Sequence, residues 1–249
     1  MATIEEGRKW LKADLWGEPL ETDQKRGVPA PPLQQPVPEG AEILDLPEPT
    51  SLKLVPQDIF FVFSNRRSRR QFAPEPLSLP ELSFLLWATQ GVHKVIRDGV
   101  ATLRTAPSAG ARHPLETYLS VHRVQGLTSG LYRYLPLAHK LCFLRKDETL
   151  PQKIVEAALG QAFVGEAAVV FVWTAVPYRT EWRYHVLSHK VIAIDAGHVC
   201  QNLYLACEAL GLATCAVAAY NQKKMDELLG VDGQDEFTLY LAPVGRRAE

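Results

Sequence analysis

The run of residues 167–176, apolar apart from Thr174, most constrains the fold of this chain. It is rich in β-branched and aromatic side chains, and Pro177 follows it directly. A run of this length and composition predicts a strand that is buried on both faces, near the centre of a sheet. Because other elements must cover both faces of such a sheet, we expect an α+β or mixed α/β fold built in layers.

Local signals predict the elements around this strand. Ser78, Pro80 and Glu81 form a capping box with proline in the first turn, which predicts a helix that ends at Gly91. Periodicity predicts further strands over 116–124, 131–134, 141–144, 213–218 and 237–242, and helices over 195–210 and 222–229. The segment 178–190 is expected to be a loop.

The first 56 residues contain nine of the eighteen prolines. Because proline lacks an amide donor and fixes the backbone, this stretch is not expected to form a regular helix or a central strand. Its apolar residues, Trp16 and Ile43 among them, give it anchors that a disordered linker lacks. The sequence therefore predicts a proline-rich arm over residues 1–56, packed on the body or on a partner subunit, and a domain over residues 57–249.

Composition and missing motifs exclude several classes of function. The net charge of −1 disfavours nucleic-acid binding, and no apolar run approaches the roughly 20 residues of a membrane span. No secretory signal is visible and the four cysteines form no C-x-x-C, so we expect a cytoplasmic protein. Glycine-rich nucleotide loops are absent. His185 and His189 are four residues apart, but no third ligand follows, so no metal site is expected.

Three segments carry unusual chemistry. In Arg66-Arg67-Ser68-Arg69-Arg70, an extended backbone would turn Arg66, Ser68 and Arg70 to one side, where they could bind a phosphate-bearing ligand. A solvated basic patch is the alternative. The small residues of 104–114 would let a backbone approach a flat ligand, although an ordinary turn explains them equally well. Polar residues interrupt the apolar helix at 197–203, where structural hydrogen bonding is the alternative to a site.

In this order and spacing, these segments resemble the flavin-dependent nitroreductase superfamily, in particular its SagB-type dehydrogenase branch. The resemblance covers about residues 52–246, and it rests on RRSRRQF, LSLPELSFLLWATQGV, RTAPSAGARHPLETYL, GLYRY, DAGHVCQNLYLACEALGLATC and LAPVGR. It implies a layered α+β fold with a central, mainly antiparallel sheet flanked by helices. It also implies a homodimer that binds FMN at the subunit interface.

The resemblance assigns FMN contacts in four segments: Arg66, Ser68 and Arg70; Pro107, Ser108 and Ala109; Ala218 and Ala219; and Arg246. The first group would contact the phosphate, the ribityl chain and the pyrimidine edge. The second, from the other subunit, would lie along the isoalloxazine ring. The alanines precede Tyr220 and would turn backbone amides to the hydride-accepting nitrogen, and Arg246 would hold the phosphate.

Two positions depart from the family pattern. Ala111 replaces an asparagine that is usual in nitroreductases, and Arg183-Tyr184 stands where azoline oxidases carry a Lys-Tyr pair. Because arginine cannot act as a base near neutral pH, Tyr184 is the one candidate catalytic residue, as a proton donor or acceptor. A lid or wall formed by Trp182 and Tyr184 is the alternative.

The function expected from the resemblance is an FMN-dependent oxidoreductase with ping-pong hydride transfer. NAD(P)H or an organic substrate would be the donor, and a small molecule would be the acceptor. Two alternatives remain open at this point. One is an azoline-to-azole dehydrogenase acting on a peptide, and the other is a flavin-binding subunit without turnover.

Overall fold

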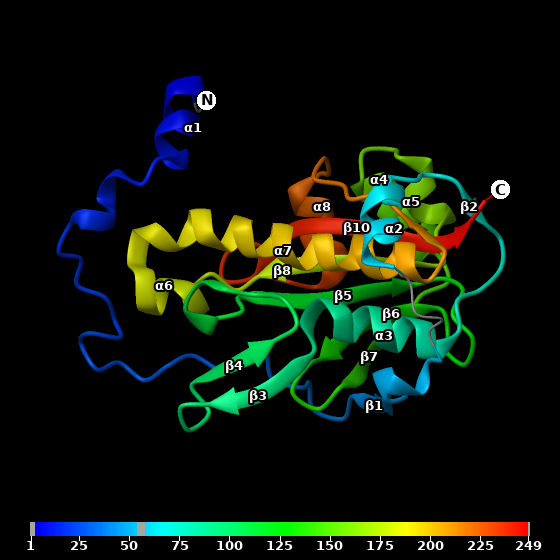
Figure 1. The fold of residues 1–249 in the computed structure, drawn as a ribbon, viewed down its shortest axis with the longest axis horizontal. Helices are drawn as coiled ribbons and strands as arrows, with labels where there is room; N and C mark the ends of the chain where they lie inside the picture. Colours follow the sequence, from blue (N-terminus) through cyan, green and yellow to red (C-terminus); the bar gives the residue numbers. More distant parts are fainter. Residues whose placement is uncertain (1–2, 54–57, 249) are drawn as a thin grey trace.

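The central strand sits where the sequence predicts it. The computed structural model describes residues 3–53 and 58–248 (Figure 1). All residues of β8 (Val169–Ala175) are buried between β5 (Leu115–Val121) and β10 (Phe237–Arg247). Phe171 and Trp173 pack in one hydrophobic cluster, and Val170 and Val172 in another. The strand is therefore buried on both faces, as expected.

Eight strands make one sheet in the order β1-β7-β6-β5-β8-β10-β2, with β9 also paired to β10. The remaining strands of the sheet are β1 (Glu42–Asp45), β2 (Phe72–Ala73), β6 (Gly130–Leu135), β7 (Lys140–Lys146) and β9 (Leu212–Thr214). All its strand pairs are antiparallel. A separate hairpin of β3 (Val92–Ile96) and β4 (Ala101–Arg104) projects from the body (Figure 1). The expected α+β fold with a mainly antiparallel sheet is confirmed.

Helices cover both faces of the sheet. The helices α3 (Leu79–Gln90) and α7 (Ser188–Ala209) contribute to one cluster, and α4 (Leu150–Ala157), α5 (Ala162–Glu166) and α8 (Gln222–Leu229) to the other. The predicted capping box is present, because Ser78 caps α3 and Glu81 bonds back to the Ser78 amide. The described part of the chain has no helix that is long and apolar enough to cross a membrane.

Several predicted boundaries were wrong. The segment 178–190 is not a loop, because α6 (Tyr178–Tyr184) and the start of α7 occupy it. The last strand continues through Pro243 to Arg247. Pro243 lies between Leu241, which bonds to Val217, and Val244, which is paired with Thr214. The backbone nitrogen of Pro243 points to the same side of β10 as Val217. No described strand residue lies opposite it on that side, so the missing N–H of proline removes no hydrogen bond from the sheet.

The first part of the arm stands away from the body, and the later part lies along it (Figure 1). Before the first proline it forms α1 (Ile4–Leu11), so the expectation of no helix was wrong there, and β1 occupies a sheet edge, where proline-flanked strands are tolerated. Three buried arginines donate hydrogen bonds to backbone carbonyls of the proline-rich part: Arg104 to Leu33, Arg133 to Pro36 and Arg179 to Pro32. The predicted boundary between residues 56 and 57 lies outside the described residues.

Candidate functional site

The arginine segment follows α2 (Ile59–Asn65), and the structure divides its arginines into two groups. The Arg69 guanidinium donates to the buried Glu208 carboxylate at 2.6 Å, and its amide donates to the Thr214 carbonyl at 2.9 Å. Arg247 donates to the same carboxylate at 2.9 Å. Arg69 is therefore a structural residue that ties this segment to α7, β9 and β10.

Arg66 and Ser68 turn instead to Tyr204 of α7. The Arg66 guanidinium carbon lies 5.3 Å from the centre of the Tyr204 ring, and the Ser68 and Tyr204 hydroxyl oxygens are 2.9 Å apart. The Ala216 amide donates to the Tyr204 hydroxyl at 2.8 Å. Tyr204 thus joins the arginine segment to the chain that leads to Ala218. Tyr204 could not be predicted as a site residue, because nothing in the local sequence separates it from a core aromatic.

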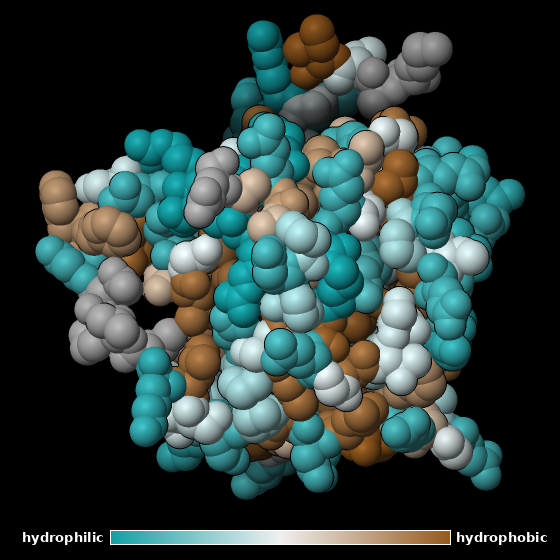
Figure 2. Space-filling model, turned by 90° about the vertical axis from the view of Figure 1, so that its right-hand side faces the viewer, coloured by the Kyte–Doolittle hydropathy of each residue, from teal (hydrophilic) through white to brown (hydrophobic). Residues whose placement is uncertain are grey.

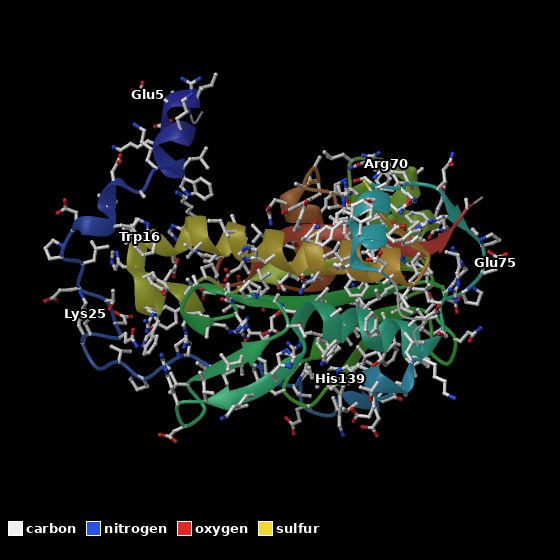
Figure 3. All side chains as sticks on the ribbon, in the orientation of Figure 1. Glu5, Trp16, Lys25, Arg70, Glu75 and His139 are labelled. Carbon is white, nitrogen blue, oxygen red and sulfur yellow. The ribbon has the colours of Figure 1, made fainter. Side chains whose placement is uncertain are left out.

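Residues of α5 and its N-cap bring Arg70 beside the predicted alanines. The Arg70 guanidinium carbon lies 5.7 Å from the centre of the Phe163 ring. Two residues earlier, Gln161 donates to the Ala219 carbonyl at 2.9 Å. The side chains of Ala218 and Ala219 are small and both residues are exposed. The first and third predicted segments therefore meet at one surface of the molecule, and Figure 3 shows Arg70 there, beside α2.

Charge at this surface is uncompensated. Within residues 3–53 and 58–248, Arg66, Arg67 and Arg70 make no ion pair with a carboxylate. Arg67 donates only to the nearby carbonyls of Ser64 and Arg66. Guanidinium groups on neighbouring residues that lack a carboxylate partner favour the binding of an anion, and phosphate suits their forked geometry. The residues present thus fit the phosphate end of FMN.

The loop with Pro107, Ser108 and Ala109 is anchored on α7 at a different place. The Ser108 hydroxyl donates to Asp195 at 2.5 Å, and the Ala109 amide donates to the other oxygen of the same carboxylate at 3.2 Å. Burial raises the pKa of Asp195, although these two bonds oppose the shift. Pro107 is exposed. Asp195 is a supporting residue that the sequence analysis saw only as the start of a helix.

Tyr184 lies against this loop. Gly110 has a positive φ of 61°, and a Cβ built on it would lie 2.7 Å from both the Tyr184 hydroxyl oxygen and the Arg183 Cδ. Only glycine allows α6 to approach the loop so closely. The structure therefore brings the candidate catalytic Tyr184 together with the second predicted segment.

The surface around the arginine segment and the loop at Ser108 form two half-sites, which lie apart within one chain. Asp195 and Tyr204 are nine residues apart on α7, which corresponds to about 14 Å along the helix. Figure 1 shows α6 at one end of α7 and α2 beside the other.

Arg246 has a different partner from the one predicted. It donates to both carboxylate oxygens of Glu81, at 2.6 and 2.7 Å. Burial alone would raise the pKa of Glu81, but the bonds from Arg246 and Ser78 outweigh it and lower the pKa. A phosphate contact from Arg246 therefore requires the phosphate to compete with this bidentate pair, and the predicted role of Arg246 stays a prediction.

The sequence of this chain is similar to sequences of known proteins. The model of the nitroreductase family matches residues 63–246. A protein of Methanocaldococcus jannaschii named as a nitroreductase is 35% identical over 206 residues, which cover 83% of this chain and 97% of that protein. The trifolitoxin-processing protein TfxB of Rhizobium leguminosarum bv. trifolii is 28% identical over 166 residues, but the match spans only 64% of this chain and 44% of TfxB.

Two solved structures have folds similar to that of this chain. One from Ralstonia eutropha, also named as a nitroreductase, has a TM-score of 0.68 and 29% identity, and the match covers 89% of this chain and 99% of that one. A chain of the Escherichia coli microcin synthetase McbBCD complex, with truncated pro-MccB17 bound, has a TM-score of 0.62. Its identity is 17%, with 100% of this chain and 99% of that one covered, so it shows the shared fold alone. The chain belongs to the nitroreductase family.

Proposed function

We propose that this protein is an FMN-dependent oxidoreductase that acts as a homodimer. Its donor is NAD(P)H or an organic substrate, and its acceptor is a small molecule. The observation that carries this proposal is a pair of arginines, Arg66 and Arg70, which make no ion pair within residues 3–53 and 58–248 and lie at the same surface as the exposed residues Ala218 and Ala219. When bound, FMN supplies the two-electron chemistry.

The residues of this chain have separate tasks in that reaction. Arg66 and Arg70 bind the phosphate end, and Ser68 adds a hydroxyl that Tyr204 orients. The loop at Ser108, fixed by Asp195, forms a wall for the ring of the cofactor, and the hydroxyl of Tyr184 beside it donates or accepts a proton at the substrate. Each task uses groups that the fold holds in place before a ligand binds.

Exposed apolar surface supports the homodimer. Four side chains of α2 are largely exposed: Ile59 at 63%, Phe60 at 75%, Phe61 at 47% and Phe63 at 58%. On the neighbouring α7, Ile194 is 45% exposed. Several large apolar side chains exposed on one helix, as on α2, indicate a protein interface. Because α2 leads directly into the arginine segment, a second copy seated here would lie beside these arginines. The four cysteines are free and buried, which suits the reducing cytoplasm we propose as its location.

Similarity to TfxB favours one second candidate, a dehydrogenase that acts on a peptide. That reaction would use the same cofactor surface, with Tyr184 moving the proton. Arg183 cannot replace the lysine of the azoline oxidases as a base, since a guanidinium stays protonated near neutral pH. We therefore favour the small-molecule reaction.

An absorption spectrum of the purified protein tests the proposal. We expect flavin bands near ~375 and ~450 nm that bleach when NADH or NADPH is added without oxygen.

Loss of one charge-assisted contact in Arg66→Ala or Arg70→Ala should weaken FMN binding by about 10- to 100-fold, whereas the control Arg67→Ala, with only local contacts, should bind nearly as well. A protein that takes up no FMN would refute the proposal. Bound flavin that NAD(P)H does not bleach would point to the peptide substrate as the donor.

A further inference from the structure

The arm crosses α6 and bonds to it at several points. The Gln24 amide donates to the Trp182 carbonyl at 2.9 Å, and the Trp182 indole donates to the Val28 carbonyl at 2.8 Å. Arg183 donates to the Gln24 side-chain oxygen at 3.0 Å. At the other end of α6, the Tyr178 hydroxyl donates to Asp23 at 2.7 Å. A helix of seven residues without a side-chain N-cap depends on such contacts for its stability.

An aromatic contact joins the arm to the candidate catalytic residue itself. The ring centres of Trp16 and Tyr184 are 5.7 Å apart, with the ring planes inclined at 56°. Figure 3 shows Trp16 and Lys25 on the part of the arm that passes α6. Trp16 follows the last turn of α1 closely, in the short helix Asp14–Gly17. It is 46% exposed, and Tyr184 is the one aromatic ring paired with it among the described residues.

The helix α6 also contacts the loop that contains Ser108 and Gly110. The Arg112 guanidinium carbon lies 4.8 Å from the centre of the Trp182 ring, and its Nε donates to the Arg179 carbonyl at 2.8 Å. Gly110 touches Arg183 and Tyr184, as described above. Arm, α6 and loop therefore form one continuous stack, in which α6 is the middle layer.

We propose that the arm positions Tyr184, with Trp16 as the positioning residue. Trp16 and the bonds of Gln24 hold α6 so that the Tyr184 hydroxyl stays against the loop at Gly110. The arm thereby sets how the acceptor approaches. FMN binding stays nearly unchanged, because the arginine half-site lies at the far end of α7 and Asp195, not the arm, holds the loop at Ser108. This inference rests on the proposed function.

Two matched tryptophans of the arm test this role. Trp16→Leu removes the ring contact, and Trp10→Leu is the control, because Trp10 is 48% exposed and has no aromatic partner within the described residues. The first measurement is hydrogen exchange of the α6 amides in the protein as purified. Loss of one aromatic pair should speed their exchange by about threefold to tenfold in Trp16→Leu and leave Trp10→Leu unchanged.

The second measurement is turnover with menadione as the acceptor. Trp16→Leu should raise the KM for menadione by about threefold to tenfold with a smaller change in kcat, and the Kd for FMN should stay as in the wild type. Trp16→Phe keeps an aromatic ring and should restore both readouts. Combined with Tyr184→Phe, the effect of Trp16→Leu on kcat/KM should be less than additive, because both changes act on one group.

The outcomes separate the two proposals. If Trp16→Leu exchanges and turns over like Trp10→Leu in a protein that binds FMN, the positioning role is refuted and the proposed function stands. Faster exchange of α6 with unchanged kinetics refutes it as well. If the wild type takes up no FMN, the proposed function fails, and the catalytic role of the arm fails with it.

Discussion

Arg69 should behave unlike the arginines on either side of it. The Glu208 side chain is 2% exposed and accepts from both Arg69 and Arg247. In Arg69→Ala, this buried carboxylate keeps one of its two cationic partners. Removing one charge-assisted hydrogen bond to a buried group costs about 1.5–3 kcal/mol. Complete loss of a buried pair costs about 3–5 kcal/mol, and Arg247 prevents that. We expect a loss of about 2 kcal/mol in the free energy of unfolding.

Thermal unfolding measures this loss directly. In a chain of this size, about 2 kcal/mol lowers the Tm by roughly 4–8 °C. Arg67→Ala is the matched control, since its side chain bonds only to local carbonyls, and its stability should stay within about 0.5 kcal/mol of the wild type. Both variants are compared without added FMN, so that ligand binding does not contribute. Equal melting of Arg69→Ala and Arg67→Ala would contradict the division of this segment into structural and binding arginines.

Two further predictions concern the other carboxylates of the site. Burial raises the pKa of Asp195, so the folded state binds this proton more tightly than the unfolded state does. The contribution of Asp195 to the free energy of unfolding should therefore fall as the pH rises above about 4. In Asp195→Asn, urea titrations at several pH values should no longer show this fall. A wild-type slope retained in the variant would disprove the assignment. Glu81 has a lowered pKa, so its pair with Arg246 stabilises fully above about pH 4.5 and less as the pH falls through that lowered pKa. Arg246→Ala should cost about 1–2 kcal/mol at pH 7 and progressively less in acid, whereas a cost independent of pH would exclude the ion pair.

Elements with a strong local signal could be predicted from the sequence. The central strand has a continuous apolar run, α3 has its capping box, and α8 ends at Gly230 with φ of 78°. The helix α6 could not be predicted, because Tyr178–Tyr184 is rich in aromatic residues and lacks an N-cap side chain. Its stability comes from the arm, more than 150 residues away in sequence at the bond between Trp182 and Val28. Long-range partners of this kind leave no local pattern.

The same limit applies to the site. The sequence shows that Arg66–Arg70 carries more charge than a core can accept, but it does not show which guanidinium is neutralised. That depends on Glu208, which lies 139 residues from Arg69. Likewise, Ser108 stands out within its loop, whereas Asp195 becomes recognisable only once the two touch. Motifs therefore identify the segments of the site, and packing decides the task of each residue.

The helix α7 also sets a constraint on length. It holds the loop through Asp195 and the arginine segment through Tyr204, on a backbone that has no freedom to stretch. One residue inserted between them would turn Tyr204 by about 100° around the helix axis and move it by about 1.5 Å. Either the bond between Ser108 and Asp195 or the bond between Ser68 and Tyr204 would then break, because a rigid helix cannot keep both side chains on the required sides. A change in the spacing of the two half-sites would therefore require whole turns of helix, whereas the connecting loops can gain or lose single residues.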